Sequence, residues 1–286
     1  MRINTNVASL VAQEANTNTN NRVGSSLEKL STGLKINKAS DDASGLSIAD
    51  KLRTQASSLT QSVANGNSAI SLIQIADKAM SETSNILDVI KQKLLQAGTA
   101  TTSSQGQAAI QKDISKLTAQ IDNIASQTNY NGLTLLQGAD SSTEVSDKIF
   151  QMGETSADTI SMTSDVLATV EGLFDNVGGA LTFVGTGTAE AEAILARSDL
   201  TRVDQAIDQL NSWRADYGST QNQIESSVRN MNTAVTNIKA AESVIRDVDY
   251  ASESANFNKQ NIISQAGTYA MSQANSAQQN VMRLLQ

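Results

Sequence analysis

Residues 203–245, VDQAIDQLNSWRADYGSTQNQIESSVRNMNTAVTNIKAAESVI, place an apolar side chain at every seventh position. A repeat of seven that lasts this long is typical of one face of a long helix that packs along other helices. No proline interrupts it, because the chain has none, and Gly218 is the one glycine inside it. At about 1.5 Å of rise per residue, the row predicts a helix roughly 65 Å long. Its apolar positions are Val203, Leu210, Tyr217, Ile224, Met231, Ile238 and Ile245.

A second row with the same period lies far from the first in the sequence. It consists of Leu52, Leu59, Gly66, Ile73, Met80, Leu87 and Leu94. The row ends near Ala97 and Gly98, where glycine is a natural helix stop. After a polar loop over residues 99–106, a third helix is predicted from Ile110, Ile114, Leu117, Ile121 and Ile124, and residues 129–132 mark its end.

Helices from three parts of one chain can bury these apolar rows against one another. This pattern predicts an elongated antiparallel heptad helix bundle with both termini at the same end. The alternative is that each row forms a coiled coil with other molecules. The short turn between the second and third helices favours the intramolecular bundle. The fold class is therefore mainly α.

The two ends of the chain read as weak helices. Residues 1–34 carry a soft apolar stripe interrupted by an Asn/Thr run of poor helix propensity, and residues 254–286 contain mostly small and polar side chains with a thin apolar face. Such helices bury too little surface to be stable alone. We expect them to pair with each other and with copies of the chain. The expected subunit-interface residues are Ile3, Val7, Leu10, Val23, Leu27, Leu30, Leu34, Ile263, Ala266, Ala270, Ala277, Val281 and Leu284.

The middle of the chain differs in both charge and pattern. Residues 140–199 hold eleven acidic and two basic side chains, whereas the two flanks together are near neutral. This charge predicts that the middle faces solvent while the flanks face each other. The runs 148–152 and 159–163 predict a small β-hairpin around Gly153. The glycine-rich stretch 164–188 is open between a short helix over 166–174, a loop and a small β excursion.

Composition excludes several kinds of chemistry. The chain has no Cys and no His, so the usual zinc ligands, the best thiol nucleophile and the commonest general base are missing. The acidic pairs Asp41/Asp42 and Asp247/Asp249 lack a full set of calcium ligands, so helix capping or interhelical ion pairing is the better interpretation. Arg214 and Asp216 are expected to form surface salt bridges. We predict no enzyme activity, no cofactor and no metal site.

Partners and location are constrained in the same way. The sequence has no basic stripe for nucleic acid and no apolar run of about 20 residues for a membrane span. Residues 1–11 lack the basic segment and apolar run of a signal peptide, so a cleaved signal is not expected.

Several blocks of the sequence resemble the bacterial flagellin family. They are the opening MRINTNVASL, LSTGLKINKASDDASGLSIADKLRTQ (30–55), TNYNGLTLL (128–136), RADYGSTQN (214–222), RDVDYA (246–251), and the blocks at 262–267 and 280–285. Together they are specific, and the resemblance covers residues 1–138 and 197–286. It implies an extracellular filament subunit, exported without a cleaved signal peptide and self-polymerising through its terminal helices into the flagellar filament that drives swimming.

The resemblance also implies a division into layers. Residues 1–45 and 254–286 would form the filament core with a connecting loop, residues 46–138 and 189–253 the helical rod bundle, and residues 139–188 a small solvent-facing insertion. Implied partners are copies of the chain, the flagellar cap and hook-junction proteins, and an export chaperone at the C-terminal arm. The expected bundle core is Leu52, Leu59, Ile73, Met80, Leu87, Leu94, Val203, Leu210, Ile224, Met231, Ile238 and Ile245. The alternatives are a hook–filament junction protein or a coiled-coil surface adhesin.

One stretch departs from the family pattern. The innate-immune receptor site of recognised flagellins resembles Arg-x-Arg-Glu-Leu. Here Val89, Gln92 and Lys93 replace the matching Arg, Glu and Leu, and Lys91 alone keeps the charge. This departure predicts weak or absent activation of that receptor.

Overall fold

The computed structural model describes residues 5–99, 101–136, 148–162, 172–173 and 189–284. The chain divides into two compact units, which are described separately. One unit combines Met1–Ser57 with Val235–Gln286, and the other is Ser58–Ala234. The predicted layer boundaries at residues 45 and 254 concern the assembled protein and stay a prediction.

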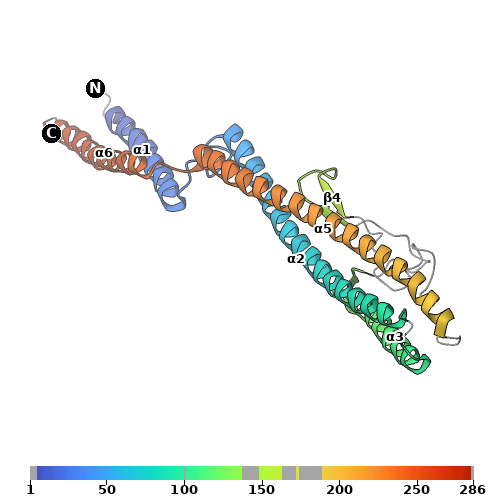
Figure 1. Cartoon of the computed structure of the whole chain (residues 1–286). Coiled ribbons are helices and arrows are strands. Elements are labelled where there is room, and N and C mark those ends of the chain that lie inside the picture. Colours follow the sequence, from blue (N-terminus) through green and yellow to red (C-terminus); the bar gives the residue numbers. More distant parts are fainter. Residues whose placement is uncertain (1–4, 100, 137–147, 163–171, 174–188, 285–286) are drawn as a thin grey trace. The chain divides into compact units, whose positions relative to one another are not determined.

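The terminal unit is built on two antiparallel helices, α1 (Val7–Thr32) and α6 (Tyr250–Leu284). They lie side by side, so that both described ends of the chain are at the same end of the pair (Figure 1). The Asn6 side chain caps the start of α1 by accepting from the Ser9 amide. Helix α1 ends at Gly33, whose φ of 73° is the left-handed conformation that glycine adopts readily.

A short joint connects these helices to the rest of their unit. Leu34 and Asp247 form an isolated antiparallel β-bridge. Around it the Lys35 amide donates to the Arg246 carbonyl at 2.7 Å, and the Val248 amide donates to the Gly33 carbonyl at 3.0 Å. The bridge therefore fixes the end of α1 beside the start of α6.

One aspartate of each acidic pair caps a helix: Asp42 caps α2 (Ala43–Ala97), and Asp249 caps α6. The Asp42 carboxylate accepts from the Gly45 amide near the start of α2. The Asp249 carboxylate accepts from the Ala251 and Ser252 amides in the first turn of α6. Backbone amides of Asn37 and Lys38 donate to Asp41, and this lowers the pKa of that carboxyl. The expected capping role is thus what the structure contains.

The second unit is a bundle of α2, α3 (Ser104–Gln127) and α5 (Ala189–Arg246). Helices α2 and α5 are antiparallel. Two ion pairs show this: Lys91, late in α2, pairs with Asp204, whereas Asp77, earlier in α2, pairs with Arg214, which lies later in α5. Lys93 pairs with Asp113 of α3, close to the turn that joins α2 and α3. The predicted intramolecular antiparallel bundle is confirmed within this unit.

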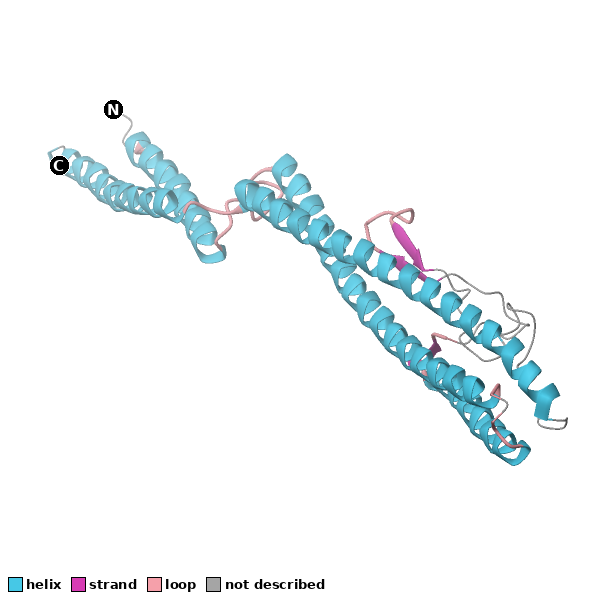
Figure 2. Cartoon of the chain, viewed as in Figure 1, coloured by secondary structure: helices cyan, strands magenta, loops and turns pink. Residues whose placement is uncertain are grey.

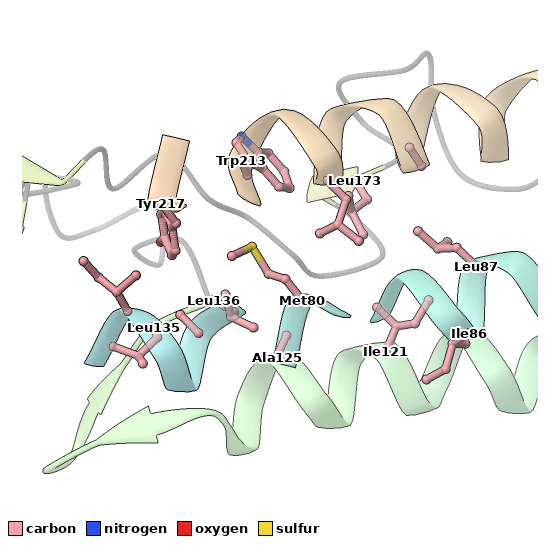
Figure 3. Packing of buried hydrophobic residues seen from close by; sticks show 14 of the residues in the cluster. Met80, Ile86, Leu87, Ile121, Ala125, Leu135, Leu136, Leu173, Trp213 and Tyr217 are labelled. Carbon is pink, nitrogen blue, oxygen red and sulfur yellow. The ribbon is translucent and has the colours of Figure 1, made fainter. Parts of the chain in front are cut away.

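The bundle core is formed by the heptad rows. Met80 and Leu87 of α2, Ile121 of α3 and Tyr217 of α5 are buried in one core cluster that runs between the helices (Figure 3). Trp213 of α5 is also buried in this cluster. Interdigitation of side chains from separate helices is what a period of seven predicts.

Two small hairpins lie against the bundle (Figure 2). Strands β1 (Asn129–Tyr130) and β2 (Leu133–Thr134) are antiparallel and lead directly into the buried Leu135 and Leu136. Strands β3 (Lys148–Gln151) and β4 (Thr159–Met162) form the predicted hairpin, with Ile160 and Met162 buried. Of the predicted excursion over 164–188, residues 172–173 are helical and the rest lies outside the described residues.

Candidate assembly surface on the terminal helices

The surface between α1 and α6 is made mostly of small and polar side chains. Along both helices the less exposed positions recur at alternating spacings of three and four, which is the seam of an antiparallel helix pair. Ser26 is the one buried side chain in α1. On α1 these positions are Asn6, Ser9, Ala12, Asn16, Thr19, Val23, Ser26 and Leu30, and on α6 they are Glu253, Phe257, Gln260, Ser264, Gly267, Met271 and Ala274.

Hydrogen bonds cross this seam along its length. At one end the side-chain amide of Asn6 donates to the backbone carbonyl of Ala274 at 3.2 Å. Near the middle the Ser264 hydroxyl donates to the Asn20 side-chain oxygen at 2.7 Å. Close to the joint the Ser26 hydroxyl donates to the Glu253 carboxylate. Because each group exchanges water for a protein partner, such bonds set the register but contribute only about 1 kcal/mol apiece.

A glycine in α6 allows the helices to approach closely at the middle of the seam. A Cβ atom added to Gly267 would lie 3.4 Å from the Asn16 side-chain oxygen. This distance is ordinary van der Waals contact, so an alanine at this position would pack directly against Asn16. Small residues at such positions permit close helix packing, as they do at other helix interfaces.

Seven large apolar side chains of the pair lie outside the seam, whereas Val23, Leu30, Phe257 and Met271 lie within it. Val7, Leu10, Val11 and Leu27 of α1 and Ile262, Ile263 and Tyr269 of α6 are between 42% and 74% exposed. An ordinary amphipathic pair would turn these groups inward and leave the serines and asparagines in water. Exposed apolar surface on this scale, on two adjacent helices, is typical of an interaction site.

The predicted interface residues fall into three groups. Those on the exposed faces are Val7, Leu10, Leu27, Ile263, Ala266, Ala270 and Ala277. Val23 and Leu30 are half-buried in the seam, and Leu34 is half-buried in the joint. Ile3 and the side chains of Val281 and Leu284 lie outside the described part of the chain.

On α6, two exposed members of this surface were missed by the sequence reasoning. Ile262 directly precedes Ile263, and Tyr269 directly precedes Ala270, so neither continues the alanine-rich stripe that defined the prediction. The signal that could have found them is side-chain size: they are among the few large apolar residues in a helix otherwise made of Ala, Ser, Asn and Gln.

The predicted bundle-core residues are buried along most of both rows. These are Ile73, Met80, Leu87 and Leu94 on α2, and Val203, Leu210, Ile224 and Met231 on α5. The outer positions Leu52, Leu59, Ile238 and Ile245 are half-buried.

The stretch that departs from the receptor motif lies on the outer face of α2. Val89 is partly exposed, and Gln92 is exposed. Lys91 pairs with Asp204 at 2.5 Å, and this hydrogen bond raises the pKa of the lysine. Lys93 pairs with Asp113 at 3.1 Å. Both cations of the stretch are therefore engaged within the protein.

The remaining polar groups considered for chemistry have structural partners. Arg214 pairs with Asp77 on α2 at 2.9 Å, rather than with Asp216. The Asp247 carboxylate accepts from the Ser243 hydroxyl at 2.6 Å. Within the described ranges there is no cluster of metal-ligating side chains, and no helix there is long and apolar enough to cross a membrane.

This combination defines a class of protein. A heptad bundle joined to a helix pair with its apolar side chains outward is the organisation of a self-assembling structural subunit. Comparison with known proteins agrees: residues 3–141 match the bacterial flagellin N-terminal helical region, and residues 200–285 match the bacterial flagellin C-terminal helical region.

Similarity to individual proteins extends over the whole chain. It is 38% identical to the flagellin of Bacillus subtilis (strain 168) and 35% identical to flagellin FlaB2 of Treponema pallidum (strain Nichols), with all of each chain covered. Among solved structures it is similar to Bacillus cereus flagellin, with 26% identity, a TM-score of 0.49, and coverage of 63% of this chain and 94% of that one.

The chain belongs to the bacterial flagellin family. It is a structural subunit of the extracellular flagellar filament, as the sequence resemblance predicted.

Proposed function

We propose that this flagellin polymerises through the outward faces of α1 and α6, with the bundle of α2, α3 and α5 as the already folded part of each subunit. The observation that carries the proposal is the inverted distribution of side chains in the terminal pair. Most of its large apolar groups are exposed, and its seam consists mostly of small and polar side chains. Covering the remaining surface of one such side chain contributes on the order of 1 kcal/mol.

Energetics support a role in assembly rather than in monomer stability. The α1–α6 seam buries little apolar surface, so the pair gains little from folding in a single chain. Neighbouring copies that cover Leu10 and Ile263 would supply the missing burial, and the terminal helices would gain stability by mass action.

Single charge substitutions on the exposed faces test this proposal. Leu10→Asp or Ile263→Asp would place a carboxylate where a neighbour must exclude water, and filaments would fail to form in electron micrographs. Circular dichroism should show that the bundle remains folded. Leu10→Met and Ile263→Leu are the matched controls and should still polymerise. Normal filaments from both aspartate variants would refute the proposal.

The extreme C-terminus offers a second test of the same surface. Val281→Asp or Leu284→Asp should abolish filaments while the bundle stays helical. Polymerisation of these variants would remove residues 281–284 from the interface without affecting the argument for Leu10 and Ile263.

Filament growth distinguishes a filament subunit from a hook–filament junction protein. Purified protein added to filament fragments should elongate them, because both exposed faces can repeat from one copy to the next. A protein that binds fragment ends without elongation would instead fit the junction role.

The same exposed helices fit the proposed transient partners. We propose that an export chaperone covers the C-terminal arm before assembly, that export proceeds without a cleaved signal, and that cap and hook-junction proteins contact the filament ends. A pull-down with residues 250–286 deleted should lose the chaperone, whereas a deletion of 7–32 should retain it.

We also propose weak or absent activation of the innate-immune receptor. Val89, Gln92 and Lys93 lack the family pattern, and both lysines of the stretch have acidic partners within the chain. A reporter-cell assay with purified monomer tests this, and strong signalling at low concentration would contradict it.

A further inference from the structure

The sequence contains two Asn-Gly pairs in contrasting surroundings. Asn131–Gly132 forms the turn between β1 and β2, and Asn65–Gly66 lies inside α2. Asn-Gly is the dipeptide in which a backbone nitrogen can most easily reach the preceding side-chain amide, because glycine has no Cβ atom to obstruct the approach.

The first pair, Asn131–Gly132, is exposed and has few contacts with the rest of the chain. Asn131 and Gly132 have φ values of 52° and 82°, so both central residues of this two-residue turn are left-handed, as in a type I′ hairpin. Both residues are exposed, and nothing lies within 4 Å of a Cβ atom added to Gly132. Within the described part of the chain, neither the Asn131 side chain nor the Gly132 amide has a hydrogen-bond partner.

The second pair is restrained on all sides. The Asn65 side chain donates to the Gln151 carbonyl at 3.4 Å and accepts from the Gln61 side chain at 3.1 Å. Gly66 is buried against Val228 and Met152, and its amide belongs to the hydrogen-bonded interior of α2.

We propose that Asn131–Gly132 is a site of spontaneous deamidation in the folded protein, and that Asn65–Gly66 is protected. The Gly132 nitrogen loses its proton to hydroxide and bonds to Cγ of Asn131. The Cγ–Nδ2 bond then breaks, and the leaving nitrogen takes a proton from water and departs as ammonia, which regenerates hydroxide. Water then opens the resulting succinimide at either carbonyl carbon, which gives aspartate or isoaspartate at position 131. No oxidant, reductant or enzyme is required.

Local opening supplies the geometry for the attack. The β1–β2 sheet pairs only two residues on each strand, so its turn can rearrange without disturbing α2 or α3. At Asn65 the same attack requires the interior of a helix to unfold.

The two products have different effects on the bundle. Aspartate tolerates a left-handed φ and preserves the turn while adding a negative charge. Isoaspartate adds a backbone methylene between Tyr130 and Leu133, which are register partners. The change lies directly before Leu135 and Leu136, which are 2% and 0% exposed, so it acts on the anchoring of the hairpin in the core.

Hydroxylamine provides a direct test because it cleaves the chain at a succinimide. The folded protein, incubated with hydroxylamine at mildly alkaline pH, should yield fragments 1–131 and 132–286. Cleavage at 131 should exceed cleavage at 65 by roughly tenfold or more, since the helix must open first. Circular dichroism of the same sample verifies that the protein stays folded.

Two controls complete the experiment. In guanidinium the contrast between the sites should disappear. Asn131→Asp should leave the protein folded and greatly reduce the fragments from that site, because the Gly132 nitrogen attacks an ionised carboxylate far more slowly than a side-chain amide. After incubation without hydroxylamine, peptide mass mapping should find aspartate and isoaspartate at position 131. Equal cleavage at both sites in the folded protein, or none at 131, would overturn the proposal.

Discussion

The Tyr217 hydroxyl is a polar group placed in an apolar core. Tyr217 is 1% exposed, and its hydroxyl has no hydrogen-bond partner within the described residues. Burial raises the pKa of this phenol to about 12, because the phenolate would lose its hydration. The ring fills its heptad position, whereas the hydroxyl contributes an unsatisfied group.

Tyr217→Phe is therefore expected to leave the bundle as stable as before, or more stable by up to about 2 kcal/mol. The two proteins should diverge further at high pH. Above pH 10 the unfolded tyrosine, with a pKa of about 10, loses its proton while the folded one keeps it. Stability of the wild type then falls by up to about 1.4 kcal/mol per pH unit until pH 12.

Denaturant titrations at pH 8 and pH 11 measure this difference. Lysine titration affects both proteins equally and cancels in the comparison. If the two unfolding free energies decrease in parallel between these pH values, Tyr217 does not titrate as its burial requires.

Two glycines inside the long helices, Gly66 in the heptad row of α2 and Gly218 beside the row of α5, should respond oppositely to alanine. A Cβ atom at Gly66 would lie 2.6 Å from the Val228 Cγ2 atom and 2.9 Å from the Met152 Cε atom, whereas nothing lies within 4 Å at Gly218. Methionine can move aside, but valine is stiff at χ1. We expect Gly66→Ala to destabilise the protein by about 1–3 kcal/mol.

Gly218→Ala is the matched control and should stabilise by about 0.5–1 kcal/mol, because alanine is the better helix former. Thermal denaturation followed by circular dichroism measures both variants. Stabilisation by Gly66→Ala would show that the Val228 contact relaxes at negligible cost.

At the scale of whole elements, a period of seven predicted α2 and α5 well. Their rows meet in one core, so an apolar residue such as Leu87 or Leu210 has one way to be buried. The terminal helices were harder to interpret. Their apolar residues predicted a subunit interface, but periodicity alone does not say which surface would cover them, and in the single chain Leu10 and Ile263 are exposed. The predicted interface therefore stays a prediction.

The polar seam was not predictable from the same pattern. Asn16, Ser264 and Gly267 carry no hydrophobic signal, and their contacts depend on how two distant segments align. The joint also could not be predicted from side-chain patterns, because the Leu34–Asp247 bridge is formed by backbone atoms. Capping by Asp42 and Asp249 could be predicted from the sequence, because a carboxylate just before a helix accepts hydrogen bonds from backbone amides only two or three residues further on.

Hydrogen exchange should separate these elements in the unassembled protein. Amides of α1 and α6 are expected to exchange roughly a hundredfold or more faster than those of 69–94 and 203–224, because the seam buries so little apolar surface. Mass spectrometry of pepsin fragments measures the rates. Comparable protection in both regions would mean that the polar seam holds the terminal helices without neighbours.

At the scale of the molecule, net charge opposes association. The chain carries a formal charge of −8 at pH 7, so approaching copies repel each other. Raising the ionic strength from about 0.01 M to 0.15 M shortens the Debye length from about 30 Å to 8 Å. The protein concentration needed for polymerisation should fall over this range. Sedimentation assays measure it, and a rising threshold would indicate that attractive ion pairs dominate.

Assembly through the outward apolar faces of α1 and α6, as proposed above, would also affect the kinetics of growth. Two free chains that meet can cover only part of each other's exposed surface, so a first pair is weak. A chain that joins an existing end contacts several neighbours at once and covers more of both faces. Nucleation is therefore the slow step, and a lag phase should precede elongation in solutions of pure monomer.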